Sequence, residues 1–193
     1  KRLVKKGVII MKRFFLTLAI VLVSINANAE TDEFVSKNYW SLTAGSAYYT
    51  EPDGFDTTAY MMAISVGHEL NDYLSIETRL GFGLTDGTET VYINPYIYTM
   101  FFSLDSLYGV YGKGCFILSR GLEVYGIAGF TKVNASFQIA GIKESDSDSG
   151  ISYGFGFGCK LKPHLKIKAE YMSYLDEIDY DFKSLELGIV REF

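Results

Sequence analysis

Apolar and polar residues alternate one by one along most of the chain after residue 30. The clearest segment is 73–84. Its apolar members are Leu74, Ile76, Leu80, Phe82 and Leu84, and the residues that alternate with them are Ser75, Glu77, Arg79, Gly81 and Gly83. A period of two is that of a β-strand, because successive side chains of a strand point to opposite faces of the sheet. The pattern therefore predicts strands with one apolar and one polar face.

Such segments recur along the chain. We predict eight strands, at 39–50, 60–69, 73–84, 107–118, 122–134, 151–161, 165–171 and 184–193. Which side of the strand at 122–134 points inward is left open, because Gly126 and Gly129 weaken the contrast between its two faces. A ten-strand alternative would use 91–102 as an extra hairpin arm, but Pro95 fits poorly in a central strand. We therefore expect an extended external loop there.

The connections between these strands alternate in length. Short turns are expected at 71–72, 119–121 and 162–164, and longer, more polar loops at 51–59, 86–106, 136–150 and 177–181. Bacterial outer-membrane barrels have short periplasmic turns and longer external loops. The polar strand faces are mostly Gly, Ser and Ala, which suits a tight barrel interior better than the wet face of a soluble sandwich. We predict an all-β fold: a closed, eight-stranded antiparallel transmembrane β-barrel, with both termini periplasmic and the loops extracellular.

Aromatic residues near the strand ends agree with a membrane location. Transmembrane barrels carry aromatic girdles at both membrane interfaces. We assign to a girdle Tyr39, Trp40, Tyr48, Tyr49, Tyr60, Tyr73 and Tyr153.

The first thirty residues have the pattern of a secretory signal. Met11-Lys12-Arg13 forms a basic start, 14–25 an apolar stretch, and Ala27-Asn28-Ala29 a cleavage site of the A-x-A type. A transmembrane anchor is the alternative, but the apolar stretch is shorter than the roughly 20 residues that a spanning helix needs. We predict an upstream, mis-set start segment at 1–10, a signal peptide at 11–29 and the barrel domain at 30–193.

Cleavage would leave an acidic protein. Residues 1–29 hold six of the 18 basic residues and none of the 23 acidic ones, so the remainder carries a net charge of −11. Nucleic acid is excluded as a partner, because phosphate affinity rests on Lys and Arg. Acidic external loops also argue against polyanions such as heparin. Acidic clusters at 144–148 and 176–181 lack the spacing of a calcium loop, and we expect mobile, solvated loops without metal.

Several charged residues fall on the polar faces that would line the barrel. Eight strands enclose a lumen just wide enough for side chains to fill, and an isolated charge in such a space is very costly. We predict an interior salt-bridge network of Glu77, Arg79, Lys113, Lys168, Glu170 and Glu186. Glu77 and Glu186 are the first candidates for the partner of Arg79, and Glu170 is the third. A proton or ion path is the alternative reading.

The two cysteines, Cys115 and Cys159, fall on strands two apart. Their side chains are expected on opposite sides of the wall, which disfavours a disulfide.

The chain resembles the small outer-membrane β-barrels of the opacity-protein, OmpX and OmpA transmembrane-domain type, the "porin family". The resemblance spans about 39–193. It is carried by 107–114 (LYGVYGKG), 122–130 (LEVYGIAGF), 153–158 (YGFGFG), 167–171 (IKAEY) and the terminal Phe193. It implies an integral outer-membrane location, contact with lipids and lipopolysaccharide, and recognition of Phe193 by the barrel assembly machinery, although Arg191 interrupts the alternation before Phe193.

These features predict a fold more sharply than a function. The only histidines, His68 and His164, both map to the periplasmic rim, so a nucleophile–base pair on the external side is disfavoured. We expect no enzyme activity and no cofactor. The first functional hypothesis is a surface barrel with a filled lumen that serves membrane integrity, adhesion or host interaction through its external loops. The alternative is a small porin-like channel for ions or small solutes.

The export signal gives a direct prediction. Protein isolated from outer membranes should begin at Glu30, because signal peptidase reads the small residues Ala27 and Ala29. Sequencing of the amino terminus checks this, and a membrane-bound chain that begins at Met11 would contradict it.

Overall fold

The computed structural model describes residues 37–193, apart from residues 53, 94, 120 and 179. The predicted signal peptide at 11–29 and the segment 1–10 lie outside these residues. Among the described residues there is no helix of the length and hydropathy that a membrane span requires.

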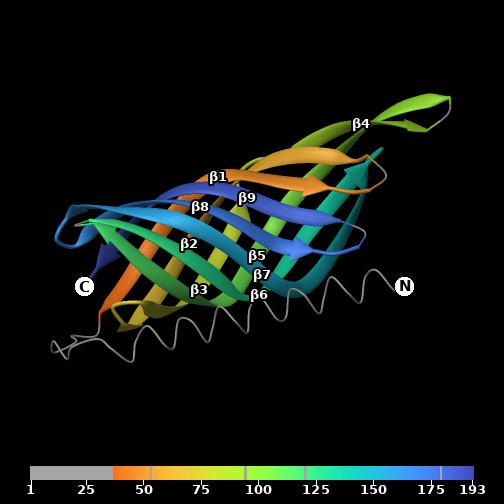
Figure 1. The fold of residues 1–193 in the computed structure, drawn as a ribbon. Coiled ribbons are helices and arrows are strands. Elements are labelled where there is room, and N and C mark those ends of the chain that lie inside the picture. Colours follow the sequence, from red (N-terminus) through yellow and green to blue (C-terminus); the bar gives the residue numbers. More distant parts are fainter. Residues whose placement is uncertain (1–36, 53, 94, 120, 179) are drawn as a thin grey trace. The chain divides into compact units, whose positions relative to one another are not determined.

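The described residues form nine antiparallel strands (Figure 1). These are β1 (Asn38–Thr50), β2 (Asp56–Asn71), β3 (Leu74–Gly83), β4 (Gly87–Ile93), β5 (Tyr96–Ser119), β6 (Leu122–Ile139), β7 (Ile142–Lys162), β8 (Leu165–Asp176) and β9 (Asp181–Glu192).

Eight of these strands close into a ring. The order around the wall is β3-β2-β1-β9-β8-β7-β6-β5, and pairing between β3 and β5 joins the two ends. In that last pair Leu74 lies opposite Gly114, and Gly81 lies opposite Leu107. The predicted closed barrel of eight antiparallel strands is confirmed. Closure leaves no unpaired edge within the ring, as a lipid environment requires.

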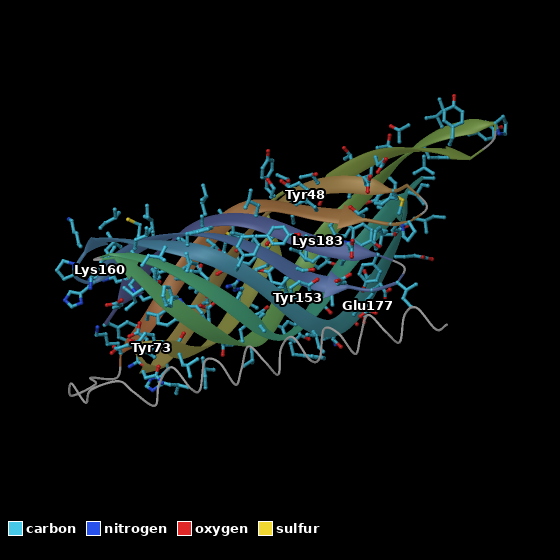
Figure 2. The ribbon with its side chains drawn as sticks, in the orientation of Figure 1. Tyr48, Tyr73, Tyr153, Lys160, Glu177 and Lys183 are labelled. Atoms are coloured by element: carbon cyan, nitrogen blue, oxygen red, sulfur yellow. The ribbon has the colours of Figure 1, made fainter. Side chains whose placement is uncertain are left out.

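Short turns at one end follow from local chemistry. The side-chain oxygen of Asn71 accepts hydrogen bonds from the backbone N–H groups of Tyr73 and Leu74, each at 2.8 Å. Asn suits such a turn because its side chain can replace a backbone acceptor. Lys160 and Tyr73 lie at this end of the barrel and Glu177 toward the other (Figure 2).

Two of the expected external loops are strands instead. Residues 87–93 form β4 and residues 96–106 are the first part of β5, and the two strands pair with each other from Gly87 opposite Phe102 to Ile93 opposite Tyr96. Pro95 therefore lies in the turn, where it removes no ladder hydrogen bond. The hairpin considered for a ten-strand barrel does form, but β4 stays outside the ring, and its arm projects beyond the ring in yellow-green (Figure 1).

The expected loop 136–150 is likewise a continuous hairpin of β6 and β7. Its turn is at Ala140-Gly141, with φ of 51° and 85°. This left-handed pair matches the twist of a two-residue hairpin. The sequence pattern missed the hairpin because residues 143–149 are polar on both faces, so they show no alternation.

The wall separates the two residue sets as predicted. On β3 Ser75, Glu77 and Arg79 are buried, whereas Ile76 and Leu80 are exposed. The same division settles β6, whose odd-numbered residues from Tyr125 to Val133 face inward. Large apolar side chains cover the outside, including Leu42, Ile64, Val66, Phe82, Val110, Phe130, Phe155, Phe157, Leu185 and Leu187. So continuous an apolar surface indicates contact with lipid.

The aromatic girdle was predicted partly wrongly. Tyr48 and Tyr60 are exposed on the outer face, but Tyr39 and Tyr49 are only 2% and 8% exposed and lie in the lumen. Neighbouring residues of a strand face opposite sides. Tyr48 and Tyr49 therefore cannot both reach the lipid.

The facing of the wall predicts how it tolerates charge. Ile64→Arg should reduce the free energy of unfolding by about 2–4 kcal/mol, because Ile64 lies near the middle of β2 and its side chain points outward. Tyr92→Arg is the matched control. Tyr92 is 75% exposed on β4, outside the ring, so this change should cost less than about 0.5 kcal/mol. Urea unfolding in lipid measures both, and equal costs would contradict the assignment of Ile64 to the lipid face.

Candidate functional site

The lumen is occupied at its middle by the guanidinium group of Arg79, which is 1% exposed. Its Nη2 lies 2.8 Å from Glu77 Oε1 and 2.5 Å from Glu170 Oε1. Its Nη1 lies 3.9 Å from Glu186 Oε1. Strands β3, β8 and β9 thus each bring one carboxylate toward a single cation.

Distances reorder the partners expected for Arg79. Glu170, ranked third from the sequence, is the closest, and Glu186, ranked among the first, is the most distant. Glu170 Oε1 is nevertheless without a hydrogen-bond partner, so its contact with Arg79 is a close ion pair that is not aligned as a hydrogen bond. The Glu77 contact is aligned, since both Nε and Nη2 of Arg79 donate to its Oε1 at 3.3 and 2.8 Å.

Each of the three carboxylates also accepts a hydrogen bond from a tyrosine hydroxyl. Tyr39 donates to Glu77 at 3.1 Å, Tyr125 to Glu170 at 2.9 Å, and Tyr174 to Glu186 at 2.7 Å. Glu186 also accepts from Thr43 and Ser184, each at 2.6 Å. A buried carboxylate needs such partners, because the attraction of the cation alone does not offset its lost hydration.

The two lysines of the predicted network are held differently. Lys168 Nζ lies 3.5 Å from Glu170 Oε2. Lys113 forms no ion pair within 4 Å in the described part of the chain, and its Nζ lies 4.5 Å from the ring centroid of Tyr125 and 5.2 Å from that of Tyr39. The ring faces of these tyrosines carry the negative charge that the ammonium group requires.

A second ion cluster lies where the short turns are. Lys166 Nζ is 3.1 Å from Glu123 and 3.0 Å from Glu192, and Lys37 is 3.9 Å from Glu192. These residues line a cavity of about 220 Å³ that reaches inward to Lys113 and Ser75. The cavity therefore extends from the short turns to lumen-facing residues, and the Arg79 cluster is not part of its lining.

Aromatic rings fill the opposite end of the lumen. The ring of Tyr49 stacks on that of Phe102, with centroids 4.8 Å apart, and lies 5.4 Å from Phe137 and 5.5 Å from Tyr180. Phe182 packs on Phe102 at 6.2 Å. We call Tyr49, Phe102, Phe137, Tyr180 and Phe182 the aromatic cap.

Sequence reasoning missed the hydroxyl groups that hold the network: Tyr39, Thr43, Tyr125, Tyr174 and Ser184. Alternation could have found most of them. Tyr174 has the same even-numbered facing as Lys168 and Glu170, but the predicted strand ended at residue 171, three residues before Tyr174, whereas β8 runs to Asp176. Phe102 could not be found in this way, because a register shift between Leu104 and Ser106 reverses the facing of β5.

Residues with other chemistry lie apart from the Arg79 cluster. His68 is exposed and contacts Asn38 across a 2.9 Å hydrogen bond, and His164 is exposed in a turn. Cys115 and Cys159 are both free, the first facing the cavity at the short turns and the second an outer groove. Within the described residues no three His, Cys, Asp or Glu side chains are grouped as a metal site.

A closed strand ring, an apolar outer surface and a charge-paired interior define an integral β-barrel of the bacterial outer membrane. The Outer membrane protein beta-barrel domain matches residues 15–193, and the chain belongs to that family. No match was found among curated proteins.

Solved structures show the same fold. Neisserial surface protein A is 15% identical, with a TM-score of 0.62, and 82% of this chain covers 99% of that one. Ail, the attachment invasion locus protein of Yersinia pestis, in complex with the heparin analogue sucrose octasulfate, is 19% identical over 82% and 99% of the chains, with a TM-score of 0.58. The N-terminal barrel of Pseudomonas aeruginosa OprF is 17% identical over 82% and 100%, with a TM-score of 0.56.

The buried cluster predicts strong coupling between its charges. Arg79→Met should lower the free energy of unfolding by about 3–5 kcal/mol, because it leaves buried carboxylates without their cation. Adding Glu77→Gln should recover part of this loss, since Arg79 is the only cation within 4 Å of Glu77 in the described part of the chain. Double-mutant cycles on the refolded barrel measure the coupling.

Lys183 and Asp181 provide the matched control for this cycle. They lie 2.7 Å apart with each side chain 33% exposed, so their coupling should stay below about 1 kcal/mol. If Arg79 couples to Glu77 and Glu170 no more strongly than this pair does, the lumen is hydrated at its middle.

Proposed function

We propose that this protein is a non-enzymatic surface barrel whose lumen is closed by its own side chains. Its role is structural and interactive: it supports the integrity of the outer membrane and contacts other surfaces, as in adhesion or host interaction, through its external end. The observation that carries this proposal is the Arg79 cluster, in which one guanidinium and three carboxylates occupy the middle of the lumen.

The cluster speaks against conduction for an energetic reason. An ion that passed the middle would have to separate Arg79 from Glu77 and Glu170, and broken pairs in a narrow, poorly hydrated space are costly. The aromatic cap adds a second obstacle, because its packed rings occupy the external end of the lumen. The cavity at the short turns is consistent with a blind vestibule.

The interactive role is supported by the shape of the other end. Hairpins β4–β5 and β6–β7 continue beyond the closed ring and expose side chains such as Tyr92, Tyr96 and Ile97. Residues of this kind on a projecting arm are suited to contact another surface.

Charge indicates which partners suit this end. Residues 51–59, 84–106, 132–152 and 174–183 contain thirteen acidic residues and three basic ones, Lys132, Lys143 and Lys183. Ail was solved with a heparin analogue, but an end with this charge would repel a sulfated polyanion. The proposed partners of this chain are therefore neutral or basic surfaces.

Other partners follow from the outer surface and the C-terminus. The apolar wall would contact lipids and lipopolysaccharide. The exposed ring of Phe193 would serve as the signal for the assembly machinery. The terminal residue is held in place by two backbone hydrogen bonds with Asn38, at 2.9 and 3.3 Å, so the proposed signal lies at the junction of β9 and β1.

Planar-bilayer recording tests the closed lumen. The purified protein should produce no steady conductance at neutral pH. The double variant Arg79→Ala/Glu170→Ala, which shortens two side chains of the cluster, should produce small openings if the cluster is the main obstacle. Steady large conductance of the unmodified protein would overturn the proposal and favour a small channel.

A further inference from the structure

The external mouth of the barrel holds a small cleft between the aromatic cap and two carboxylates. Its lining includes Tyr49, Phe137 and Tyr180 from the cap, and Asp146 and Asp148 from β7, and its volume is about 50 Å³. Since one water occupies roughly 10–15 Å³ on this measure, the cleft fits the end of one side chain and not a lipid or a sugar ring.

The cleft exists because β7 is much longer than its neighbour β8. Pairing between them begins only at Tyr153 and Ser173, so residues 142–152 of β7 pair with β6 alone. Asp148 lies opposite the buried residue Val133 of the paired strand β6 and Asp146 lies opposite Ala135, so both share the facing of Ser152. They therefore stand over the mouth of the lumen, opposite the hairpin between β8 and β9.

One hydrogen bond fixes the two walls of the cleft. Tyr180 donates its hydroxyl proton to Asp148 Oδ2 across 2.5 Å. Burial and this hydrogen bond raise the pKa of Tyr180, so the phenol remains a donor at any physiological pH. Oδ1 of Asp146 accepts a hydrogen bond from the backbone N–H of Ser147, and Oδ1 of Asp148 accepts one from that of Ser149. Oδ2 of Asp146 accepts no hydrogen bond from the described residues, so it is the oxygen that a ligand could reach.

We propose that this cleft receives an arginine side chain of a basic polypeptide partner. A guanidinium group is planar, stacks on aromatic rings and donates hydrogen bonds to carboxylates in a fixed fork. The cleft offers both kinds of partner at once: ring surfaces from Phe137 and Tyr180, and carboxylate oxygens from Asp146 and Asp148. The acidic surroundings described above would attract a basic segment before it docks.

This inference rests on the proposed surface-interaction role, because it names a partner for the external end. It does not depend on whether the lumen conducts. A barrel that stays silent in planar bilayers but fails to bind the peptides below would refute the inference and leave the closed lumen standing.

The binding experiment uses three labelled peptides of equal length. Each consists of Gly and Ser around two central positions that hold arginine, lysine or citrulline. Citrulline has nearly the shape of arginine but no charge. Fluorescence anisotropy with the refolded protein in zwitterionic lipid nanodiscs measures Kd. The arginine peptide should bind best, the lysine peptide several-fold more weakly, and the citrulline peptide at least about tenfold more weakly.

Variants locate the binding in the cleft. Asp146→Asn/Asp148→Asn should weaken the arginine peptide about tenfold, whereas Asp86→Asn/Glu89→Gln, which removes two charges elsewhere on the external end, should change Kd by less than about twofold. Tyr180→Leu should weaken binding several-fold, and Tyr180→Phe should retain most of it, because the ring is kept.

Three results would overturn the proposal. Equal losses in the two double variants would mean diffuse attraction by net charge and no site. Equal binding of the citrulline peptide would mean apolar contact without charge recognition. Equal affinity for free arginine amide and for the arginine peptide would mean a small-molecule site in place of a polypeptide partner.

Discussion

Within a bilayer no water is available to the backbone, so every N–H and C=O group of a membrane-spanning segment must be paired inside the protein. In this chain that constraint is met by the pairing of β3 with β5, which runs from Leu74 opposite Gly114 to Gly81 opposite Leu107 and closes the ring. Without it two strand edges would lie open in hydrocarbon. Closure also fixes the division of each strand into a lipid face and a lumen face, on which the site depends.

The narrow lumen imposes a second requirement on the residues that face it. Glu77, Arg79, Lys168, Glu170 and Glu186 are almost fully buried, and each needs an opposite charge or a hydroxyl partner. Their tyrosine partners come from four different strands. These are Tyr39 on β1, Tyr111 on β5, whose ring contacts Arg79, Tyr125 on β6 and Tyr174 on β8. The cluster therefore ties distant parts of the wall together, and the same packing that stabilises the barrel fills its lumen at this level.

Beyond the lipid the constraint on backbone pairing is relaxed, and the structure changes accordingly. Water can satisfy an open strand edge, so β7 extends over 142–152 with β6 as its only partner, and β4 pairs with β5 alone. The free edge of β7 is rich in Glu, Asp and Lys, which discourages edge-to-edge association. The difference in length between β7 and β8 also creates the cleft beside the aromatic cap, because it leaves one wall of the mouth without a neighbour.

Much of this architecture could be predicted from the sequence alone. Alternation identified the ring strands, the outward facing of Ile64 and Leu80, and the set of charged residues in the lumen, because facing along a strand depends only on odd or even position. The external hairpins could not be found in this way. A polar strand such as 143–149 buries neither of its faces, so its apolar and polar residues do not alternate. Only its pairing with β6 identifies it as a strand.

What the tertiary structure alone decided is which residues meet across the lumen. Glu170 lies nearest to Arg79, although Glu77 is two residues away in the chain, because the stagger of β8 against β3 brings their side chains to one level. A register shift in β5 points the side chain of Phe102 inward, so that it joins the aromatic cap. Because β8 continues past the predicted end at residue 171, Tyr174 lies between Arg79 and Glu186 and forms a hydrogen bond with each. The face of the wall on which a side chain lies is a property of one strand and can be read from its residues. The height of that side chain along the barrel axis is a property of the closed ring, since it depends on the registers and bulges of all the strands between two residues.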